Sequence, residues 1–403
     1  MKNKETMTFI EQLLNGENVE WKKLGEVITI EKGKQLNKSL LTESGEYPAY
    51  NGGVTFSGFT DKYNYSENKI IISQGGASAG FVNFITTKFY ANAHCYVVLP
   101  NISRVDNKYV YHLLKMNQEN LMGKQLGAGI PALHTANILG ISIPIPCPDN
   151  PTKSLDIQHR IVEILDKFTE LEAELEAELD CRKRQYEYYR NQLLSFDMLN
   201  RGGQRLNDVK IMTLGEIGEI RMCKRILKGQ TSTCGDVPFY KIGTFGKTPN
   251  AFISKKLFTE YKIKYSYPKI GEVLISASGT IGKTVIFDGQ DAYFQDSNIV
   301  WIENDESMAL NKYLYYCYQV IKWKTAEGGT INRLYNDIIK KTRIPLPPLS
   351  VQREIVEILD KFDTLTNSIS EGLPKEIELR RKQYEYYRNQ LLSFSTVKEK
   401  YHG

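Results

Sequence analysis

The clearest pattern in the chain is a regular return of apolar side chains between residues 161 and 196. They recur at alternating intervals of four and three residues, which places them along one side of a helix. Only Glu172 and Arg182 interrupt the series. Its members are Ile161, Leu165, Phe168, Leu175, Leu179, Tyr186, Tyr189, Leu193 and Phe196. A narrow stripe with this period predicts a long helix with a coiled-coil seam.

A second stripe of the same kind lies near the C-terminus. Its members are Ile355, Leu359, Phe362, Ile369, Leu373, Ile377, Tyr384, Tyr387, Leu391 and Phe394. Gly372 and Pro374 fall within this series. Because proline lacks a backbone N–H and clashes with the preceding turn, we expect the second helix to bend or break there.

The two helical segments are copies of one another. The run IVEILDKF occupies residues 161–168 and 355–362, and the run QYEYYRNQLLSF occupies residues 185–196 and 383–394. The copies of the first run begin 194 residues apart and those of the second run 198 residues apart, so the later segment has four extra residues. Four residues make about one helical turn, and we expect them to keep the same face largely in phase.

The regions outside the helices have a different pattern. Short apolar runs at residues 69–72, 96–99, 273–275 and 298–301 lie between stretches rich in Gly, Asn and Ser. This pattern predicts a mixed domain dominated by strands in each region. Each domain also has one helix, near residues 107–117 in the first and 311–324 in the second.

Together these patterns predict an α+β fold with two strand-rich mixed domains, related by a pseudo-twofold axis and separated by two long antiparallel coiled-coil helices. We assign residues 1–150 to the first domain, 151–200 to the first helix, 201–346 to the second domain, and 347–403 to the second helix and C-terminal tail. Residues 12–14 and 192–194 are both Gln-Leu-Leu. This match predicts that the start of the chain packs beside the end of the second helix.

Composition agrees with a multidomain soluble protein. A chain of 403 residues exceeds the size at which a single core stops growing. There is no apolar run long enough to span a membrane, and the first 14 residues lack the features of a secretory signal, so we expect a cytoplasmic protein. The six cysteines form no CxxC pair and only five histidines are present, which favours free thiols over disulfides or zinc.

The net charge of +5 is unevenly distributed. Residues 155–196 and 349–394 together carry −5, so the remainder of the chain carries +10. The basic surface therefore belongs to the two strand-rich regions, which favours a polyanionic partner.

Basic and small polar residues mark candidate DNA contacts. Lysines and an arginine follow an early strand in both copies, where they could neutralise phosphates. The glycine- and serine-rich loops at residues 73–80 and 276–282 would approach a DNA groove closely. The alternative is that these are ordinary turns with solvated lysines. The candidates are Lys32, Lys34, Lys38, Gln74, Ser78, Lys224, Arg225, Lys228, Ser278, Thr280 and Lys283.

Catalytic motifs are incomplete. Residues 279–284 resemble a phosphate-binding loop, but Ala277 stands where that motif requires glycine. Residues 346–349, Leu-Pro-Pro-Leu, lack the polar and aromatic residues of a base-methylating loop. We therefore expect no catalytic residue and no metal site in this chain.

The repeated DKF and QYEYYRNQLLSF segments, the Ile-Pro-Ile-Pro-Cys-Pro run at residues 143–148 and the duplicated layout resemble the specificity subunits of type I restriction-modification systems, in particular their IC-like subgroup. The resemblance implies a non-catalytic protein whose two target-recognition domains each recognise one half of a bipartite site in double-stranded DNA. It also implies two modification (methyltransferase) subunits and the restriction (motor-nuclease) subunits as partners. S-adenosylmethionine, ATP and magnesium would bind to those partners and not to this chain.

Residues 170–179 alternate Glu-Leu-Glu-Ala in units of four. Each unit adds about 6 Å of helix and about 40° of rotation, which approximates one base pair in rotation. We hypothesise that one more Leu-Glu-Ala-Glu unit lengthens the unread spacer by about one or two base pairs. Two other functions stay open at this point: a coiled-coil scaffold without sequence-specific DNA binding, and a self-contained methyltransferase or nuclease.

Overall fold

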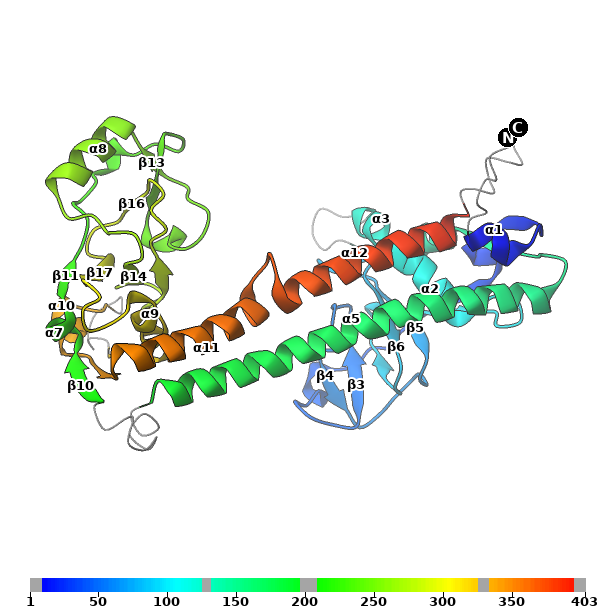
Figure 1. Cartoon of the computed structure of the whole chain (residues 1–403). Coiled ribbons are helices and arrows are strands. Elements are labelled where there is room, and N and C mark those ends of the chain that lie inside the picture. Colours follow the sequence, from blue (N-terminus) through cyan, green and yellow to red (C-terminus); the bar gives the residue numbers. More distant parts are fainter. Residues whose placement is uncertain (1–8, 125–131, 196–208, 325–332, 395–403) are drawn as a thin grey trace, which may run out of the picture. The chain divides into compact units, whose positions relative to one another are not determined.

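The computed structural model describes residues 9–124, 132–195, 209–324 and 333–394 (Figure 1). The chain forms two compact units. Unit 1 consists of residues 1–176 and 376–403, and unit 2 of residues 177–375. Each unit therefore combines one strand-rich region with parts of both helical segments.

Unit 1 contains a four-stranded antiparallel sheet, a three-stranded sheet and a two-stranded ribbon. In sheet order, the strands are β2 (Ile28–Lys32), β8 (Cys95–Pro100), β5 (Lys69–Ser73) and β6 (Val82–Ile85), then β4 (Gly58–Thr60), β3 (Tyr47–Tyr50) and β7 (Tyr90–Ala91), then β1 (Val19–Lys23) and β9 (Ser142–Pro146). Both faces of β5 are covered: Ile70 and Ile72 join one apolar cluster and Ile71 joins another. Burial on both faces explains its continuous apolar run.

Unit 2 repeats this arrangement. In sheet order, its strands are β11 (Glu219–Arg221), β17 (Ile299–Glu303), β14 (Val273–Ser276) and β15 (Thr284–Ile286), then β13 (Phe252–Ile253), β12 (Val237–Tyr240) and β16 (Tyr293–Phe294), then β10 (Lys210–Thr213) and β18 (Arg343–Leu346). Strand β14 again serves two clusters, with Val273 and Ile275 in one and Leu274 in the other. The predicted α+β class and the four predicted strand runs are confirmed.

Short helices complete each unit. Those of unit 1 are α1 (Phe9–Leu14), α2 (Asn107–Met116), α3 (Gln118–Gly123) and α4 (Thr135–Leu139), and those of unit 2 are α7 (Leu214–Ile217), α8 (Lys255–Lys264), α9 (Asn311–Val320) and α10 (Asn336–Lys341). Helix α9 is shorter than predicted, because the backbone of Ile321 turns to an extended conformation. Of these short helices only α2 and α9 were predicted, and α8 is the longest of the others. It starts at the N-cap Ser254, whose hydroxyl accepts a hydrogen bond from the Leu257 N–H.

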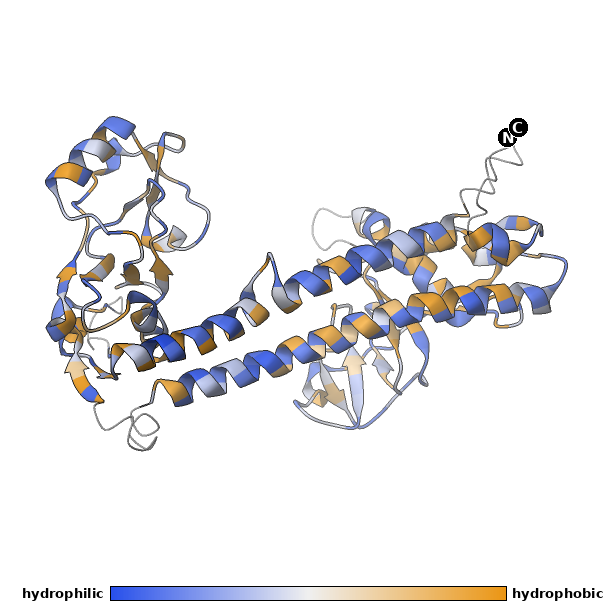
Figure 2. Ribbon diagram, viewed as in Figure 1, coloured by the Kyte–Doolittle hydropathy of each residue, from blue (hydrophilic) through white to orange (hydrophobic). Residues whose placement is uncertain are grey.

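The first long helix, α5 (Pro151–Leu193), is continuous over 43 residues. Figure 2 shows its apolar residues as separate bands among polar ones, as expected for an amphipathic helix. In unit 1 its first part runs antiparallel to the last part of α12 (Gly372–Ser393): Phe168 stacks on Tyr387 and Glu172 pairs with Arg381. Within the described residues, the predicted stripe of α5 packs against the second helical segment. Phe196, its last predicted member, lies outside them.

The second long segment is interrupted where it was expected to bend. Helix α11 (Leu349–Asn367) ends before residues 368–371, which are not helical, and α12 begins at Gly372. The four extra residues therefore form no helical turn, although buried positions continue on both sides of them. Ile369, assigned to the seam from its spacing, is 85% exposed.

The chain start packs as predicted. Ile10, Leu13 and Leu14 of α1 are buried in the same apolar cluster as Leu391 and Leu392 of α12. All of them belong to unit 1. Both long segments fall within the residue ranges assigned to them. As a division of the chain into domains, the boundaries at 150, 200 and 346 stay a prediction.

Candidate nucleic-acid interface

Five loops meet in unit 1 at the ends of the two larger sheets. We call residues 33–40, 51–57, 74–80, 92–95 and 132–134 loop cluster 1. The N–H of Gln74 donates to the carbonyl of His94 (2.8 Å), and the N–H of Leu133 donates to the carbonyl of Gln74 (2.8 Å). The buried side chain of Asn92 both accepts from and donates to the backbone of Leu36. These bonds fix loops that are far apart in sequence on one part of the unit.

Unit 2 builds an equivalent set from residues 223–231, 241–247, 277–282, 295–298 and 333–335, which we call loop cluster 2. The N–H of Ala277 donates to the carbonyl of Asn298 (2.7 Å), and the N–H of Leu334 donates to the carbonyl of Ala277 (2.8 Å). Isolated bridges join Gly75 to Ala132 in cluster 1 and Ser278 to Arg333 in cluster 2. The backbone scaffold of the two clusters is thus the same.

Glycines allow the tight turns in both clusters. Gly76 and Gly279 have φ angles of +80° and +65°, a region that residues with a side chain rarely adopt. A Cβ atom on Gly76 would meet nothing within 4 Å, so its small size is not needed to avoid a clash inside the unit. The glycine supplies the backbone conformation and leaves the loop surface open.

Strand register decides which basic residues correspond. Glu31 and Ile71 both pair with Val97, as Arg221 and Leu274 both pair with Trp301. Counting from Glu31 and Arg221 makes Lys34 equivalent to Lys224 and Lys38 to Lys228. The other two members of the predicted groups have no basic counterpart, since Lys32 corresponds to Met222 and Arg225 to Gln35.

Most of the predicted basic residues are exposed. Lys32, Lys34 and Lys38 extend from loop cluster 1 or the strand leading into it, and Lys38 and Lys228 each begin a short 3-10 turn. Lys224 lies 5.2 Å from the ring centre of Tyr265. Arg225 is exposed but pairs with Asp296 at 2.7 Å, so a phosphate would compete with that carboxylate.

Two predicted contacts have internal roles instead. The hydroxyl of Ser278, which is 8% exposed, donates to Asn298 Oδ1 at 2.8 Å. The ammonium group of Lys283 donates to the carbonyls of Phe245 (2.6 Å) and Gly246 (3.4 Å). Both residues hold the loops together. Gln74 and Ser78 are partly buried and Thr280 is exposed, and their roles as DNA contacts stay predictions.

The structure adds residues that the sequence patterns missed. Arg333 donates to the hydroxyl of Ser297 (2.7 Å) and lies over the ring of Tyr335, which is exposed. His134 takes the place of Tyr335 in loop cluster 1, because Leu133 and Leu334 make the equivalent backbone bonds. The Leu-His and Leu-Tyr pairs were a usable signal, but nothing in the sequence places Leu133 and Leu334 next to loops 74–80 and 277–282.

The cysteines of the two loop clusters are buried, and the described parts of the chain contain no metal cluster. Burial raises the pKa of Cys95 to about 11 and that of Cys223 to about 12, so both thiols stay protonated at neutral pH. Within residues 9–124, 132–195, 209–324 and 333–394, no group of three or more His, Cys, Asp or Glu side chains could hold a metal ion. In the same residues, no helix is both long and apolar enough to cross a membrane.

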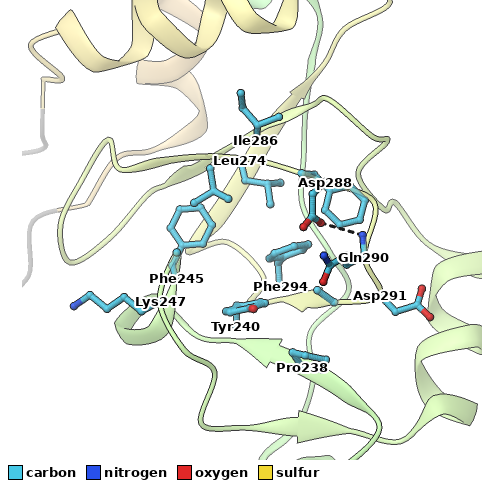
Figure 3. A pocket seen from close by; sticks show the side chains of 14 residues that line it. Pro238, Tyr240, Phe245, Lys247, Leu274, Ile286, Asp288, Gln290, Asp291 and Phe294 are labelled. Atoms are coloured by element: carbon cyan, nitrogen blue, oxygen red, sulfur yellow. Dashed lines mark hydrogen bonds between the residues drawn. The ribbon is translucent and has the colours of Figure 1, made fainter. Parts of the chain in front are cut away.

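A pocket of about 310 Å³ lies beside loop cluster 2 (Figure 3). Its walls include Tyr240, Phe245 and Phe294, and Asp288 accepts a hydrogen bond from the N–H of Gln290 (2.9 Å). Asp291 also lines it. The Asp291 carboxylate pairs with Lys255 and Lys262, and the rings of Phe245 and Phe294 offer a phosphate no hydrogen-bond donor, so the exposed lysines of the loops are the better phosphate contacts.

Comparison with known proteins defines the class. Residues 16–180 and 207–379 each match the family model described as the type I restriction modification DNA specificity domain. The chain therefore belongs to the family of type I restriction-modification specificity proteins, and the two matches coincide with its internal duplication.

Individual relatives agree along the whole length. The chain is 49% identical to a Haemophilus influenzae protein named as a type I restriction enzyme specificity subunit, over 97% of this chain and 100% of that protein. It is 35% identical to the EcoR124I/EcoR124II specificity subunit of Escherichia coli, over 96% and 97%. The crystal structure of the type I S subunit from M. genitalium has the same fold, with a TM-score of 0.58 and 21% identity over 94% and 97%.

Proposed function

We propose that this chain is the DNA-recognition subunit of a type I restriction-modification complex, and that loop clusters 1 and 2 each recognise one half of a bipartite site. The observation that carries this proposal is the occurrence of two equivalent loop scaffolds, each with exposed lysines at matching positions, in a chain of the specificity family. Exposed lysines would contact phosphates, and the loop ends around Gly76 and Gly279 would approach the bases.

We further propose that the chain is cytoplasmic and acts by recognition rather than catalysis. S-adenosylmethionine would then bind to two modification subunits, and ATP and magnesium would serve these and the restriction subunits. The long helices would hold those partners and set the length of the unread DNA between the half-sites. The family membership supports this assignment over a scaffold that does not recognise DNA.

The direct test is co-expression with the cognate modification subunits in a host that lacks other adenine methylation, followed by single-molecule mapping of methylated adenines. A bipartite motif with a fixed gap is expected. A stable complex that adds no methylation would reject the proposal and favour a scaffold.

The contribution of the loops is tested by charge reversal in the assembled complex. Lys228→Glu is expected to weaken duplex binding by a similar factor for every sequence and to lower the slope of log affinity against log salt by about 1. Lys256→Glu on α8 is the matched control, since Lys256 is also exposed but lies outside loop cluster 2. Equal effects of the two substitutions would assign binding to overall charge and not to this cluster.

A further inference from the structure

The two long helical segments differ in length, and the difference is confined to one place. Helix α5 runs unbroken through the Glu-Leu-Glu-Ala repeats, whereas the second segment leaves the helix at residues 368–371. With the offset of 194 before this point and 198 after it, Asn367 matches Ala173 and Gly372 matches Glu174. The four non-helical residues are therefore the four that have no counterpart in α5.

The geometry at Gly372 indicates that the chain leaves the helix after Asn367 and re-enters it at almost the same position along the helix axis. A Cβ atom on Gly372 would lie 2.4 Å from the carbonyl oxygen of Thr364 and 2.8 Å from that of Leu365. In an uninterrupted helix, the residue four beyond Thr364 and three beyond Leu365 is residue 368. Gly372 thus takes the place that residue 368 would otherwise occupy.

Residue types explain why this excursion is possible. Gly372 has a φ of +79°, and any side chain there would strike the two carbonyl oxygens. Pro374 lies in the first turn of α12, where a missing backbone N–H does no harm. The hydroxyl of Ser368 accepts hydrogen bonds from the N–H groups of Ser370 (3.3 Å) and Glu371 (3.2 Å), which closes the excursion on itself.

Burial shows that the seam continues across the excursion. Thr366 is 1% exposed, Ile369 is 85% exposed and Leu373 is 8% exposed. When residues 368–371 are skipped, the buried positions lie three, four or seven residues apart. Each then corresponds to a member of the α5 stripe, except Thr366, which corresponds to Glu172. The matched buried positions are Ile355, Leu359, Thr366, Leu373, Ile377, Tyr384 and Leu391. Four residues added within the helix would instead rotate the following stripe by about 40°.

We propose that residues 368–371 add nothing to the effective length of the second helix, so that the unread spacer of the DNA site is set by α5 and the helical residues matched to it. This inference rests on the proposed function as a DNA-recognition subunit. It assigns the excursion as a segment that can be shortened or lengthened without changing the gap between the half-sites.

The test measures the gap in methylated sites made by complexes of the full chain with its modification subunits. One variant lacks residues 368–371 and carries Gly372→Glu and Pro374→Glu, the residues found at the matching positions of α5. A second variant has four additional Gly and Ser residues between Ser370 and Glu371. Both are expected to give the gap of the unaltered protein, because the number of matched helical residues is unchanged. The second variant keeps the test valid if the first does not assemble.

The control inserts Leu-Glu-Ala-Glu after Glu178 and, at the matching position of the second helix, after Glu376. This change lengthens both helices by about 6 Å and is expected to widen the gap by about one or two base pairs. A gap altered by either change to the excursion overturns the inference while leaving DNA recognition intact. If the control leaves the gap unaltered, helix length does not set the spacer and the inference fails. If the unaltered protein gives no bipartite methylation, the proposed function itself is rejected.

Discussion

Units 1 and 2 hold their domains against the long helices with polar contacts that are partly shared and partly different. In both units a lysine pairs with an aspartate of a long helix: Lys108 with Asp166 at 2.5 Å and Lys312 with Asp360 at 3.1 Å. In both, a buried tyrosine on the helix that carries the lysine (Tyr109 on α2, Tyr313 on α9) donates a hydrogen bond to a proline carbonyl. The duplicated sequence of α2 and α9 explains these shared contacts.

The buried polar contacts differ one helical turn after these lysines, at His112 of α2 and Tyr316 of α9. In unit 1 the buried His112 contacts Asp166 through Nε2 (3.0 Å) and the hydroxyl of Tyr384 through Nδ1 (2.9 Å). In unit 2 Tyr316 takes its place and donates to Asp360. The hydroxyl of Tyr186, which matches Tyr384, is then left buried without a hydrogen-bond partner among the described residues.

This comparison shows that matched positions of a duplicated sequence can need different hydrogen-bond partners. An ionised aspartate only accepts hydrogen bonds, so His112 donates from Nε2 and accepts the Tyr384 proton at Nδ1. A tyrosine at position 316 has only one hydroxyl, which reaches Asp360 and not Tyr186. Identical substitutions in the repeated helical segments should therefore have different effects in the two units.

The largest effect is expected from His112→Leu, which keeps a similar volume but removes the partner of Tyr384 and one donor to Asp166. Leaving buried polar groups unpaired should destabilise unit 1 by about 2–4 kcal/mol. Hydrogen-deuterium exchange of the full chain should show faster exchange in α2 peptides and little change in α9 peptides, which serve as the internal control. Unchanged protection of α2 would mean that the His112 contacts contribute nothing to stability.

Acidification should affect unit 1 more than unit 2. Burial lowers the pKa of His112, opposed by Asp166 and reinforced by the charges of Lys108 and Arg388. The unfolded chain therefore binds a proton at His112 more readily than the folded chain, so stability falls as pH drops below about 6.5, by at most about 1.4 kcal/mol for each pH unit. Exchange in α2 should accelerate between pH 6.5 and 5 relative to α9, after correction for intrinsic rates. His112→Tyr, which copies unit 2, should abolish that difference.

The same substitution at matched tyrosines should have opposite signs. Tyr384→Phe removes a hydroxyl that is bonded to His112 and should destabilise unit 1 by about 1 kcal/mol. Tyr186→Phe removes a buried hydroxyl that lacks a partner in the described structure and should stabilise unit 2 by about 1 kcal/mol. Exchange rates in the peptides of each unit give both values from one experiment. Equal effects in the two units would contradict the asymmetry.

The smallest effect is expected at Lys115, whose counterpart in unit 2 is Gln319. Burial, with a further contribution from Arg388, lowers the pKa of Lys115 to about 8, whereas Gln319 accepts a hydrogen bond from Arg190 (3.0 Å). Because the pKa is lower in the folded state than in the unfolded chain, stability should rise with pH between about 8 and 10.5. Lys115→Gln should change the stability of unit 1 by less than about 1 kcal/mol at pH 7, because relief of the buried charge is offset by loss of the hydrogen bonds to the Val82 carbonyl (3.2 Å) and Gln118 Oε1 (2.9 Å). The substitution should also remove that rise. A rise that survives the substitution would belong to another group.

Much of the fold follows from local patterns. The runs at residues 69–72 and 273–275 predicted strands, and the structure covers both faces of each strand. Gly372 and Pro374 predicted the interruption of the second helix from backbone chemistry alone. Helix α8 was missed because its sequence is mostly polar and contains few apolar residues to set a period.

The candidate site was only partly predictable. Exposed lysines near matching turns could be found from charge and repeats, which gave Lys34, Lys38, Lys224 and Lys228. Ser278 and Lys283 were given surface roles, but their polar atoms bind neighbouring loops. Arg333 and Tyr335 were missed because they join the cluster through contacts with segments tens of residues away.

The sequence by itself determined the duplication, the helical stripes, the strand-rich character of both regions and the position of the helix break, since each depends on residue types over a short stretch or on identity between copies. Only the tertiary structure decided which loops form each cluster, which buried tyrosine has a partner, and that residues 368–371 are looped out and not an added turn. These outcomes depend on hydrogen bonds and steric contacts between residues distant in the chain, or on which of two backbone paths preserves the buried seam, and spacing along the sequence does not distinguish between them.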